Sequence, residues 1–211
     1  MIYLLSPLKK GGTFSLPMIS FNIVSETIKF FSCDLLMFTS KQAVVSAHSI
    51  DISWKDYPCI AIGKATKKQI ESLGGEVIYA PKDFYGEILA KDIQKLFFDK
   101  RILYLRPKAV SFDSKAYLAE QGIELYEQII YETSCICYVE KDKPQKNVVI
   151  IFTSPSTVQC FFKNFDWDES YTAVLIGKAT HKHLPKECNY VIADEPLIDA
   201  CVKKAKELKF S

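Results

Sequence analysis

Two short segments of the sequence place a threonine and a serine directly after a run of apolar residues. Residues 36–40 read LMFTS, and residues 150–154 read IIFTS. Hydroxyl groups at the start of a helix can bind an anion together with the helix backbone N–H groups. The candidate ligand-binding hydroxyls here are those of Thr39, Ser40, Thr153 and Ser154. The same residues also suit plain helix capping, which is worth about 1 kcal/mol, and Ser154 followed by Pro155 is typical of a helix start.

The sequence Ile-Gly-Lys-Ala-Thr occurs twice and offers a second kind of anion contact. Gly63 and Gly177 leave room for a ligand to approach the backbone closely. Lys64 and Lys178 fall in or just before the first turn of a predicted helix, where a cation opposes the helix dipole at a cost of roughly 0.3–1 kcal/mol. An anionic ligand bound at the helix N-terminus would make the lysine favourable instead of costly. Such a site in each half of the chain predicts a ligand with several carboxylates or phosphates, and solvated lysines are the alternative.

Five further side chains could contact a ligand. Thr66 and Thr180 end the repeated sequence and could point a hydroxyl into a cleft. Arg106 and Lys108 follow a predicted strand, so they place two cations at the edge where parallel sheets bind ligands. Tyr131 ends another predicted strand, and its phenol could donate a proton as a general acid. Solvated cations and a packed aromatic are the alternatives.

Other motifs are uninformative or absent. No phosphate-binding P-loop and no Gly-x-Gly-x-x-Gly sequence follows a strand, which disfavours nucleotide binding. Cys135 and Cys137 are two residues apart, which is not a redox or zinc spacing, and His181 and His183 have no third ligand at metal spacing. Seven cysteines in a chain that can bury a core without crosslinks favour reduced, inert thiols in a cytoplasmic compartment. The sequence predicts no metal site.

The two kinds of motif repeat with one offset. The threonines of the first kind are residues 39 and 153, and the last threonines of the second kind are residues 66 and 180, so both offsets are 114 residues. A shared offset predicts two similar domains. Each copy alternates apolar strands with amphipathic helices, which predicts an α/β class with parallel sheets in α/β/α layers.

The expected elements follow from apolar periodicity and turn residues. Strands are expected over 34–39, 59–62, 76–80, 101–105, 123–131, 148–153, 173–176 and 190–193. Helices are expected over 41–48, 65–73, 84–98, 114–121, 157–162, 180–183 and 198–208. Residues 1–5 form an extra apolar strand, which we assign to the sheet of the second copy. The chain would then build one discontinuous domain from residues 1–18 and 136–211, with residues 19–135 inserted as the other. Crossovers near 18–24 and 131–139 would form a two-stranded antiparallel ladder.

Composition excludes several classes of function. The chain has 211 residues, 48% hydrophobic and 25% charged, which is typical of a globular protein. A net charge of +2 gives no strong field for nucleic acid or an anionic membrane. The longest apolar runs, such as residues 148–152, are far shorter than the roughly 20 residues of a membrane helix, and no signal peptide is recognisable. We expect a cytoplasmic monomer with no nucleic-acid or membrane partner.

The motifs, taken in order, resemble those of the uroporphyrinogen-III synthase family. The resemblance covers nearly the whole chain and rests on residues 16–21, 38–40, 62–66, 101–106, 131–133, 152–156 and 176–180. It implies two α/β domains joined by a two-stranded ladder. It also implies closure of linear hydroxymethylbilane to uroporphyrinogen III, with inversion of the last pyrrole ring and loss of water, in tetrapyrrole (haem) biosynthesis. No metal or organic cofactor is needed.

The resemblance implies roles for particular residues. The substrate carries eight carboxylates; loss of its hydroxyl gives an azafulvenium cation, which closes through a spiro intermediate. Tyr131 matches the family tyrosine proposed to assist departure of the hydroxyl. Thr66 and Thr180 match threonines of the cleft, and Ser154 and Ser156 match its Ser-Pro-Ser turn.

The sequence departs from the family pattern in three places. Ser6-Pro7 stands where the family often has Arg-Pro, Lys64 and Lys178 stand where many members have proline, and only residues 140–147 replace a helix. Which side chain holds which carboxylate therefore stays open. Two alternatives also remain. A binding module for a small polyanion would not turn over and would keep its affinity after Tyr131→Phe, and a regulatory protein of this fold would expose a large apolar patch.

Overall fold

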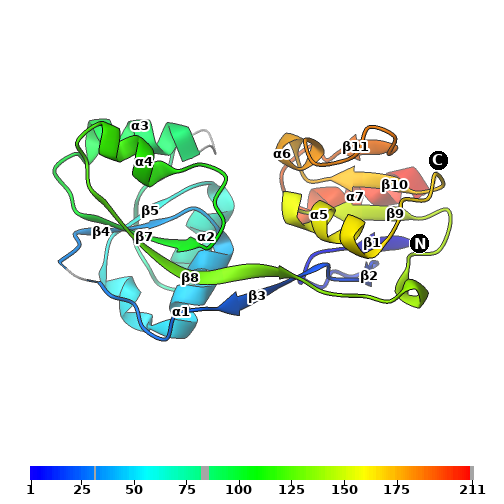
Figure 1. The fold of residues 1–211 in the computed structure, drawn as a ribbon, viewed down its shortest axis with the longest axis horizontal. Helices are drawn as coiled ribbons and strands as arrows, with labels where there is room; N and C mark the ends of the chain where they lie inside the picture. Colours follow the sequence, from blue (N-terminus) through cyan, green and yellow to red (C-terminus); the bar gives the residue numbers. More distant parts are fainter. Residues whose placement is uncertain (31, 82–85, 210–211) are drawn as a thin grey trace. The chain divides into compact units, whose positions relative to one another are not determined.

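The computed structural model describes residues 1–30, 32–81 and 86–209 (Figure 1). The chain divides into two compact units. Unit 1 comprises Met1–Ser20 and Ser134–Ser211, and unit 2 comprises Phe21–Thr133. Each unit contains a sheet of parallel strands with helices on its faces, which confirms the predicted mixed α/β class. Residues 84 and 85, at the start of one predicted helix, lie outside the described residues.

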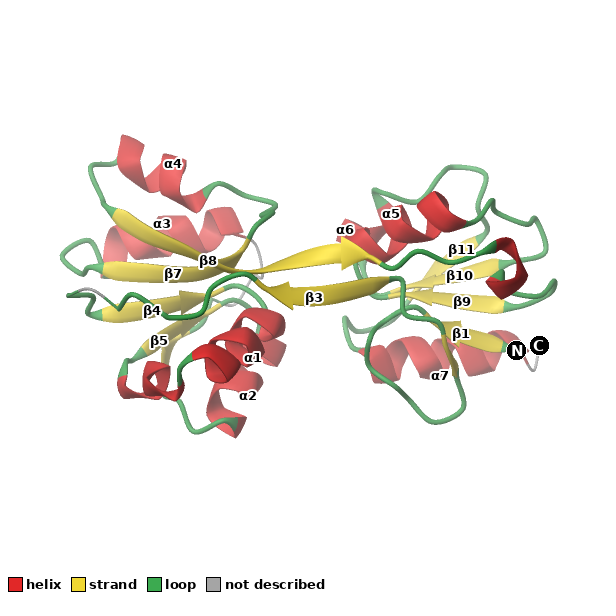
Figure 2. Cartoon of the chain, turned by 60° about the horizontal axis from the view of Figure 1, so that its bottom comes forward, coloured by secondary structure: helices red, strands yellow, loops and turns green. Residues whose placement is uncertain are grey.

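The larger sheet has six strands. In spatial order they are β3 (Ile19–Ile23), β8 (Leu125–Cys135), β7 (Ile102–Pro107), β4 (Leu35–Phe38), β5 (Cys59–Ala61) and β6 (Val77–Tyr79). From β8 to β6 every pair of neighbours is parallel. β3 lies beside β8 and runs in the opposite direction (Figure 2). The Val24 N–H donates to the Ile130 carbonyl at 3.1 Å, and the Ile136 N–H donates to the Met18 carbonyl at 2.9 Å.

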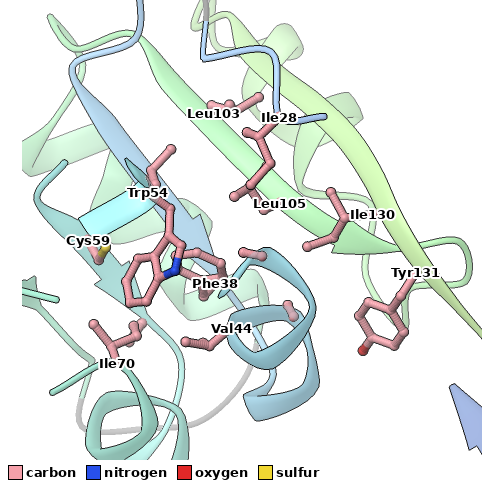
Figure 3. Packing of buried hydrophobic residues seen from close by; sticks show 14 residues of the cluster. Ile28, Phe38, Val44, Trp54, Cys59, Ile70, Leu103, Leu105, Ile130 and Tyr131 are labelled. Carbon is pink, nitrogen blue, oxygen red and sulfur yellow. The ribbon is translucent and has the colours of Figure 1, made fainter. Parts of the chain in front are cut away.

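Helices cover both faces of this sheet. They are α1 (Lys41–Ile50) and α2 (Lys64–Ser72) on one face, and α3 (Gly86–Leu96) and α4 (Ser114–Glu120) on the other. A 3-10 helix, η1 (Ile52–Asp56), places Trp54 in the core beneath α1 and α2. There its ring packs edge-on against that of Phe38, with ring centroids 5.6 Å apart. Tyr131 lies at the margin of that core, near α1 (Figure 3).

The sheet of unit 1 has five strands, all parallel. Their spatial order is β11 (Tyr190–Ile192), β10 (Thr172–Leu175), β9 (Val149–Phe152), β1 (Ile2–Leu4) and β2 (Phe14–Ser15). The predicted strand at residues 1–5 does join this sheet, because Tyr3 of β1 pairs with Ile150 of β9. β2 was not predicted; two exposed residues are too few to show a strand pattern.

The helices of unit 1 also pack on opposite sides of their sheet. They are α5 (Pro155–Asn164), α6 (Lys178–His181) and α7 (Ile198–Lys209). Cys201 and Ala205 of α7 pack with Ile151 of β9, whereas the next β9 residue, Phe152, meets Phe161 of α5 with ring centroids 5.5 Å apart. Residues 140–147, which stand in place of a helix of the family pattern, contain a short 3-10 helix, η2 (Glu140–Asp142).

One cysteine prediction is wrong. Cys135, the last residue of β8, forms a disulfide with Cys160 of α5, with Cα atoms 5.2 Å apart. The fold brings together two residues that are 25 positions apart, whereas the sequence drew attention to the neighbouring Cys137, which is a free and exposed thiol. One turn after Cys160, the Asn164 amide donates to the Ile136 carbonyl at 2.9 Å and accepts the Tyr138 N–H at 2.7 Å. Both contacts attach the segment after β8 to α5.

Candidate functional site

The start of α1 brings Ser40 and Tyr131 together. Ser40 is the N-cap, and its Oγ accepts the Ala43 N–H at 3.1 Å. The same hydroxyl lies 2.9 Å from the phenol of Tyr131, which reaches it from β8. Tyr131 is 4% exposed, and its burial raises the pKa of the phenol, while the hydrogen bond with Ser40 opposes that shift. The phenol is therefore protonated at neutral pH and has a proton to donate.

A second hydroxyl pair lies one residue earlier. The hydroxyls of Thr39 and Tyr104 are 2.7 Å apart, and Tyr104 belongs to β7, the neighbour of β4. Tyr104 is 3% exposed, and burial raises the pKa of its phenol to about 12. Tyr104 was not among the site residues predicted from the sequence. The available signal was a phenol between the apolar residues Leu103 and Leu105 of β7.

The Gly-Lys-Ala-Thr segments begin α2 and α6, as predicted. Gly63 is the N-cap of α2 with φ 81°, a conformation that favours glycine, and Lys64 is the exposed first residue of the helix. Lys178 has the same exposed place in α6. Thr66 and Thr180 are only 4% and 2% exposed, so the structure does not present their side chains to solvent as expected. Thr66 lies on the same face of α2 as Ile70, which packs in the core against the sheet, and this explains its burial.

The start of α5 is the counterpart of α1 in unit 1. Ser154 is the N-cap, and its Oγ accepts the Thr157 N–H at 3.2 Å. The Thr157 hydroxyl accepts the Ser154 N–H at 3.2 Å and donates to the Ser154 carbonyl at 2.7 Å. This reciprocal arrangement is a capping box. Thr153 and Ser156, on either side of Ser154 and Pro155, are partly buried.

Arg106 lies within β7, which runs to Pro107 and so is longer than predicted, and Lys108 follows the strand; both cations are paired with carboxylates of β8. Arg106 Nε lies 3.2 Å from Glu127 Oε1, with both side chains largely buried, and Lys108 Nζ lies 3.0 Å from Glu132 Oε2. The parallel register of the two strands produces these pairs. The structure therefore gives Arg106 a neutralising partner that the sequence did not indicate. Lys108 is 68% exposed, so its weak surface pair leaves it able to contact a ligand.

Ser6 was noted in the sequence only as a departure from the family pattern. Tyr104 pairs with Met37 across β7 and β4, and Leu4 pairs with Ile151 across β1 and β9. Met37 and Ile151 are related by the internal repeat, so their partners Tyr104 and Leu4 occupy equivalent places in the two sheets. Ser6 and Arg106 each come two residues after these partners, so Ser6 takes the place in unit 1 that Arg106 takes in unit 2. Ser6 is 5% exposed, and its Oγ accepts the Leu8 N–H at 3.2 Å.

The described residues contain neither a metal-binding cluster nor a membrane-spanning helix. Within residues 1–30, 32–81 and 86–209, no three or more His, Cys, Asp or Glu side chains are grouped so that they could hold a metal ion. The ring of His181 packs against Tyr190 with centroids 4.3 Å apart, and His183 is exposed. None of the helices in the described part of the chain is long and apolar enough to cross a membrane.

Comparisons with known proteins identify the family. The family model described as Uroporphyrinogen-III synthase HemD matches residues 9–203. A comparison with curated protein sequences gave no significant match. Among solved structures, the uroporphyrinogen-III synthetase of Helicobacter pylori 26695 is similar over 98% of this chain and 98% of its own, with 24% identity and a TM-score of 0.81. A mutant uroporphyrinogen III synthase of the extremely thermophilic bacterium Thermus thermophilus is similar over 100% and 99%, with 13% identity and a TM-score of 0.59.

The two structural likenesses show a shared fold, and the family model shows the family, because it spans most of the sequence. The chain belongs to the uroporphyrinogen-III synthase family, the cyclising lyases of haem biosynthesis.

Proposed function

We propose that the chain closes hydroxymethylbilane to uroporphyrinogen III and that Tyr131 is its general acid. The observation that carries the proposal is the pairing of the Tyr131 and Ser40 hydroxyls at 2.9 Å in a chain of this family. The buried phenol donates its proton to the departing hydroxyl of the substrate, which leaves as water. Attack by the distal ring, closure through the spiro intermediate and loss of a ring proton then follow, and that proton restores the phenol.

The start of α1 supports this role electrostatically. A phenolate forms at Tyr131 when its proton leaves, and Ser40 can donate a hydrogen bond to it. Ser40 is also the N-cap of the ten-residue helix α1, so the positive end of the helix dipole lies beside the developing charge. Fixed dipoles of this kind stabilise charge without reorganising during the reaction.

Substrate binding is proposed for hydroxyls, backbone N–H groups and cations at the carboxyl ends of the strands in both units. In unit 2 these are Thr39, Ser40, Gly63, Lys64 and Lys108, with Arg106 supporting them through its pair with Glu127. In unit 1 they are Thr153, Ser154, Ser156, Gly177 and Lys178. Thr66 and Thr180 are not included, because their side chains are buried. Several separate donor sets suit a substrate whose eight carboxylates are spread over four rings.

The organisation of the chain is part of the proposal. We propose that units 1 and 2 are two α/β domains joined by an antiparallel ladder of β3 and β8, with boundaries within two residues of those expected from the sequence. The protein is proposed to act as a cytoplasmic monomer without cofactor. Because disulfides are rare in a reducing cytoplasm, the redox state of Cys135 and Cys160 in cells tests that location.

Product analysis tests the function. Freshly generated hydroxymethylbilane is supplied to the protein, the products are oxidised, and uroporphyrin isomers I and III are separated by chromatography. Spontaneous closure gives isomer I, so a protein-dependent rise in isomer III supports the proposal. Isomer I alone, from folded protein, overturns it. Saturable binding of the bilane without isomer III would then favour the polyanion-binding module.

A further inference from the structure

Tyr104 is a buried phenol that the proposed mechanism does not use. Its hydroxyl lies 2.7 Å from that of Thr39, which follows β4 and begins the turn into α1. We propose that Tyr104 is a positioning residue: it donates its hydrogen bond to Thr39 and so fixes the Thr39 hydroxyl as a donor toward a substrate carboxylate. The inference rests on the proposed function, and it assigns a task to a residue that does not itself touch the substrate.

Strand geometry separates the two tyrosines. Thr39 and Ser40 are neighbours in the chain, and successive residues at the end of a strand point to opposite faces of the sheet. Thr39 meets Tyr104, which belongs to the core beneath α3 and α4, whereas Ser40 meets Tyr131, which belongs to the core beneath α1. The two pairs can therefore be altered one at a time.

The chemistry of the pair sets the direction of the hydrogen bond. A phenol is more acidic than an aliphatic alcohol, so it is the stronger donor, and the threonine oxygen is the better acceptor. Tyr104 is 3% exposed, and burial keeps its phenol protonated over the whole physiological range. When Tyr104 donates, the proton of Thr39 is directed elsewhere. A partly buried hydroxyl with a free proton is suited to a carboxylate, because hydrogen bonds to an ionised acceptor are the strong ones.

The charges around Tyr104 do not compete for this hydrogen bond. Glu127 is its partner across β8, and Arg106 lies two residues along β7. These two side chains form an ion pair, with Arg106 Nε 3.2 Å from Glu127 Oε1, so each charge is largely cancelled by the other. Lys108, further along, is paired with Glu132. Thr39 is thus the hydroxyl partner left to the phenol.

The test is a double-mutant cycle between Tyr104→Phe and Thr39→Val, with the rate of isomer III formation measured over a range of bilane concentrations. Each single change is expected to raise KM by about tenfold, as for loss of one hydrogen bond to a charged group, and to change kcat by less than about twofold. The double variant is expected to show the same KM as Thr39→Val alone. Thr39→Ser restores the hydroxyl and should recover most of the affinity.

Tyr79→Phe is the matched control, because Tyr79 packs against the same core and donates to Asp92 Oδ2 at 2.8 Å, away from Thr39. It should leave KM unchanged. The inference is overturned if Tyr104→Phe lowers the melting temperature but not the affinity, or if the KM effects of the two changes multiply. A wild-type protein that makes only isomer I would overturn the proposed function and this inference together. If the wild type makes isomer III and Tyr104→Phe leaves KM unchanged, the inference alone is overturned.

Discussion

The hydroxyls of Tyr131 and Ser40 lie 2.9 Å apart, and the Ser40 oxygen also accepts the backbone N–H of Ala43. A tyrosine at the margin of the core is thereby connected through one side chain to the N-terminus of α1. The Tyr131 ring is held from the other side by Phe21, which meets it edge-on with centroids 5.8 Å apart. These contacts fix the phenol in place and put the positive end of a helix dipole beside it.

Removing the Tyr131 hydroxyl tests its role as an acid. Tyr131→Phe should slow the formation of isomer III by about 10²–10⁴-fold, because a positioned general acid contributes that much. Initial rates with fresh bilane measure the effect. Tyr126→Phe is the control, since Tyr126 lies on the same strand and donates to Glu124 Oε2 at 2.7 Å. A loss of only a few-fold would mean that positioning dominates and that Tyr131 is not the key acid.

Alkaline pH should destabilise the protein through Tyr104. The pKa of this phenol is raised to about 12 in the folded protein and is about 10 in the unfolded chain. Its contribution to stability is fully present below pH 10. Between pH 10 and 12 the unfolded chain releases a proton that the folded protein retains, so the free energy of unfolding falls by about 1.4 kcal/mol per pH unit.

Urea unfolding at pH 9, 10 and 11 measures this slope in the wild type and in Tyr104→Phe. In the variant, the free energy of unfolding should fall less steeply with pH, by about 1.4 kcal/mol per pH unit, since it lacks the titrating phenol. Cys59, whose pKa burial also raises to about 12, is common to both proteins and cancels in the comparison. If the free energy of unfolding falls with pH equally in both proteins, the pKa of Tyr104 is not raised by folding.

Lys64 should have opposite effects on stability and on substrate affinity. It is the exposed first residue of α2, where a cation opposes the helix dipole. Lys64→Ala should therefore raise the free energy of unfolding by about 0.3–1 kcal/mol and, if Lys64 holds a carboxylate, also raise KM for the bilane. Lys68→Ala, an exposed change within the same helix, should leave KM unchanged. If KM stays the same in both variants, Lys64 is only a solvated lysine.

The Cys135–Cys160 disulfide should stabilise the protein. It closes a loop of 25 residues, which corresponds to about 3.5 kcal/mol of unfolding free energy in the chain-entropy model. Cys135→Ser should lower the midpoint of urea unfolding, and dithiothreitol should lower that of the wild type to a similar value. Cys137→Ser, a change at the exposed free thiol, should have little effect. Equal midpoints for the oxidised and reduced wild type would contradict the prediction.

Local features of the site could be predicted because they depend on residues close together in the chain. Ser40 and Ser154 cap α1 and α5, and Lys64 and Lys178 begin α2 and α6. Strand periodicity and the shared 114-residue offset likewise predicted parallel sheets, and the apolar run at residues 1–5 was placed in the right sheet. Capping, helix dipoles and apolar periodicity act over one or two turns, so single segments contain the information.

The tertiary structure alone decided which distant side chains meet. Thr39 and Tyr104 are 65 residues apart in the chain, Ser40 and Tyr131 are 91 apart, and both pairs depend on how β4, β7 and β8 align in the sheet. Strand register also placed Glu127 beside Arg106, and the packing of α5 against the end of β8 joined Cys135 to Cys160. The composition and the repeat specified what kinds of groups line the strand ends. Their pairing is set by strand register and by packing in the cores, to which strands and helices from distant parts of the chain contribute.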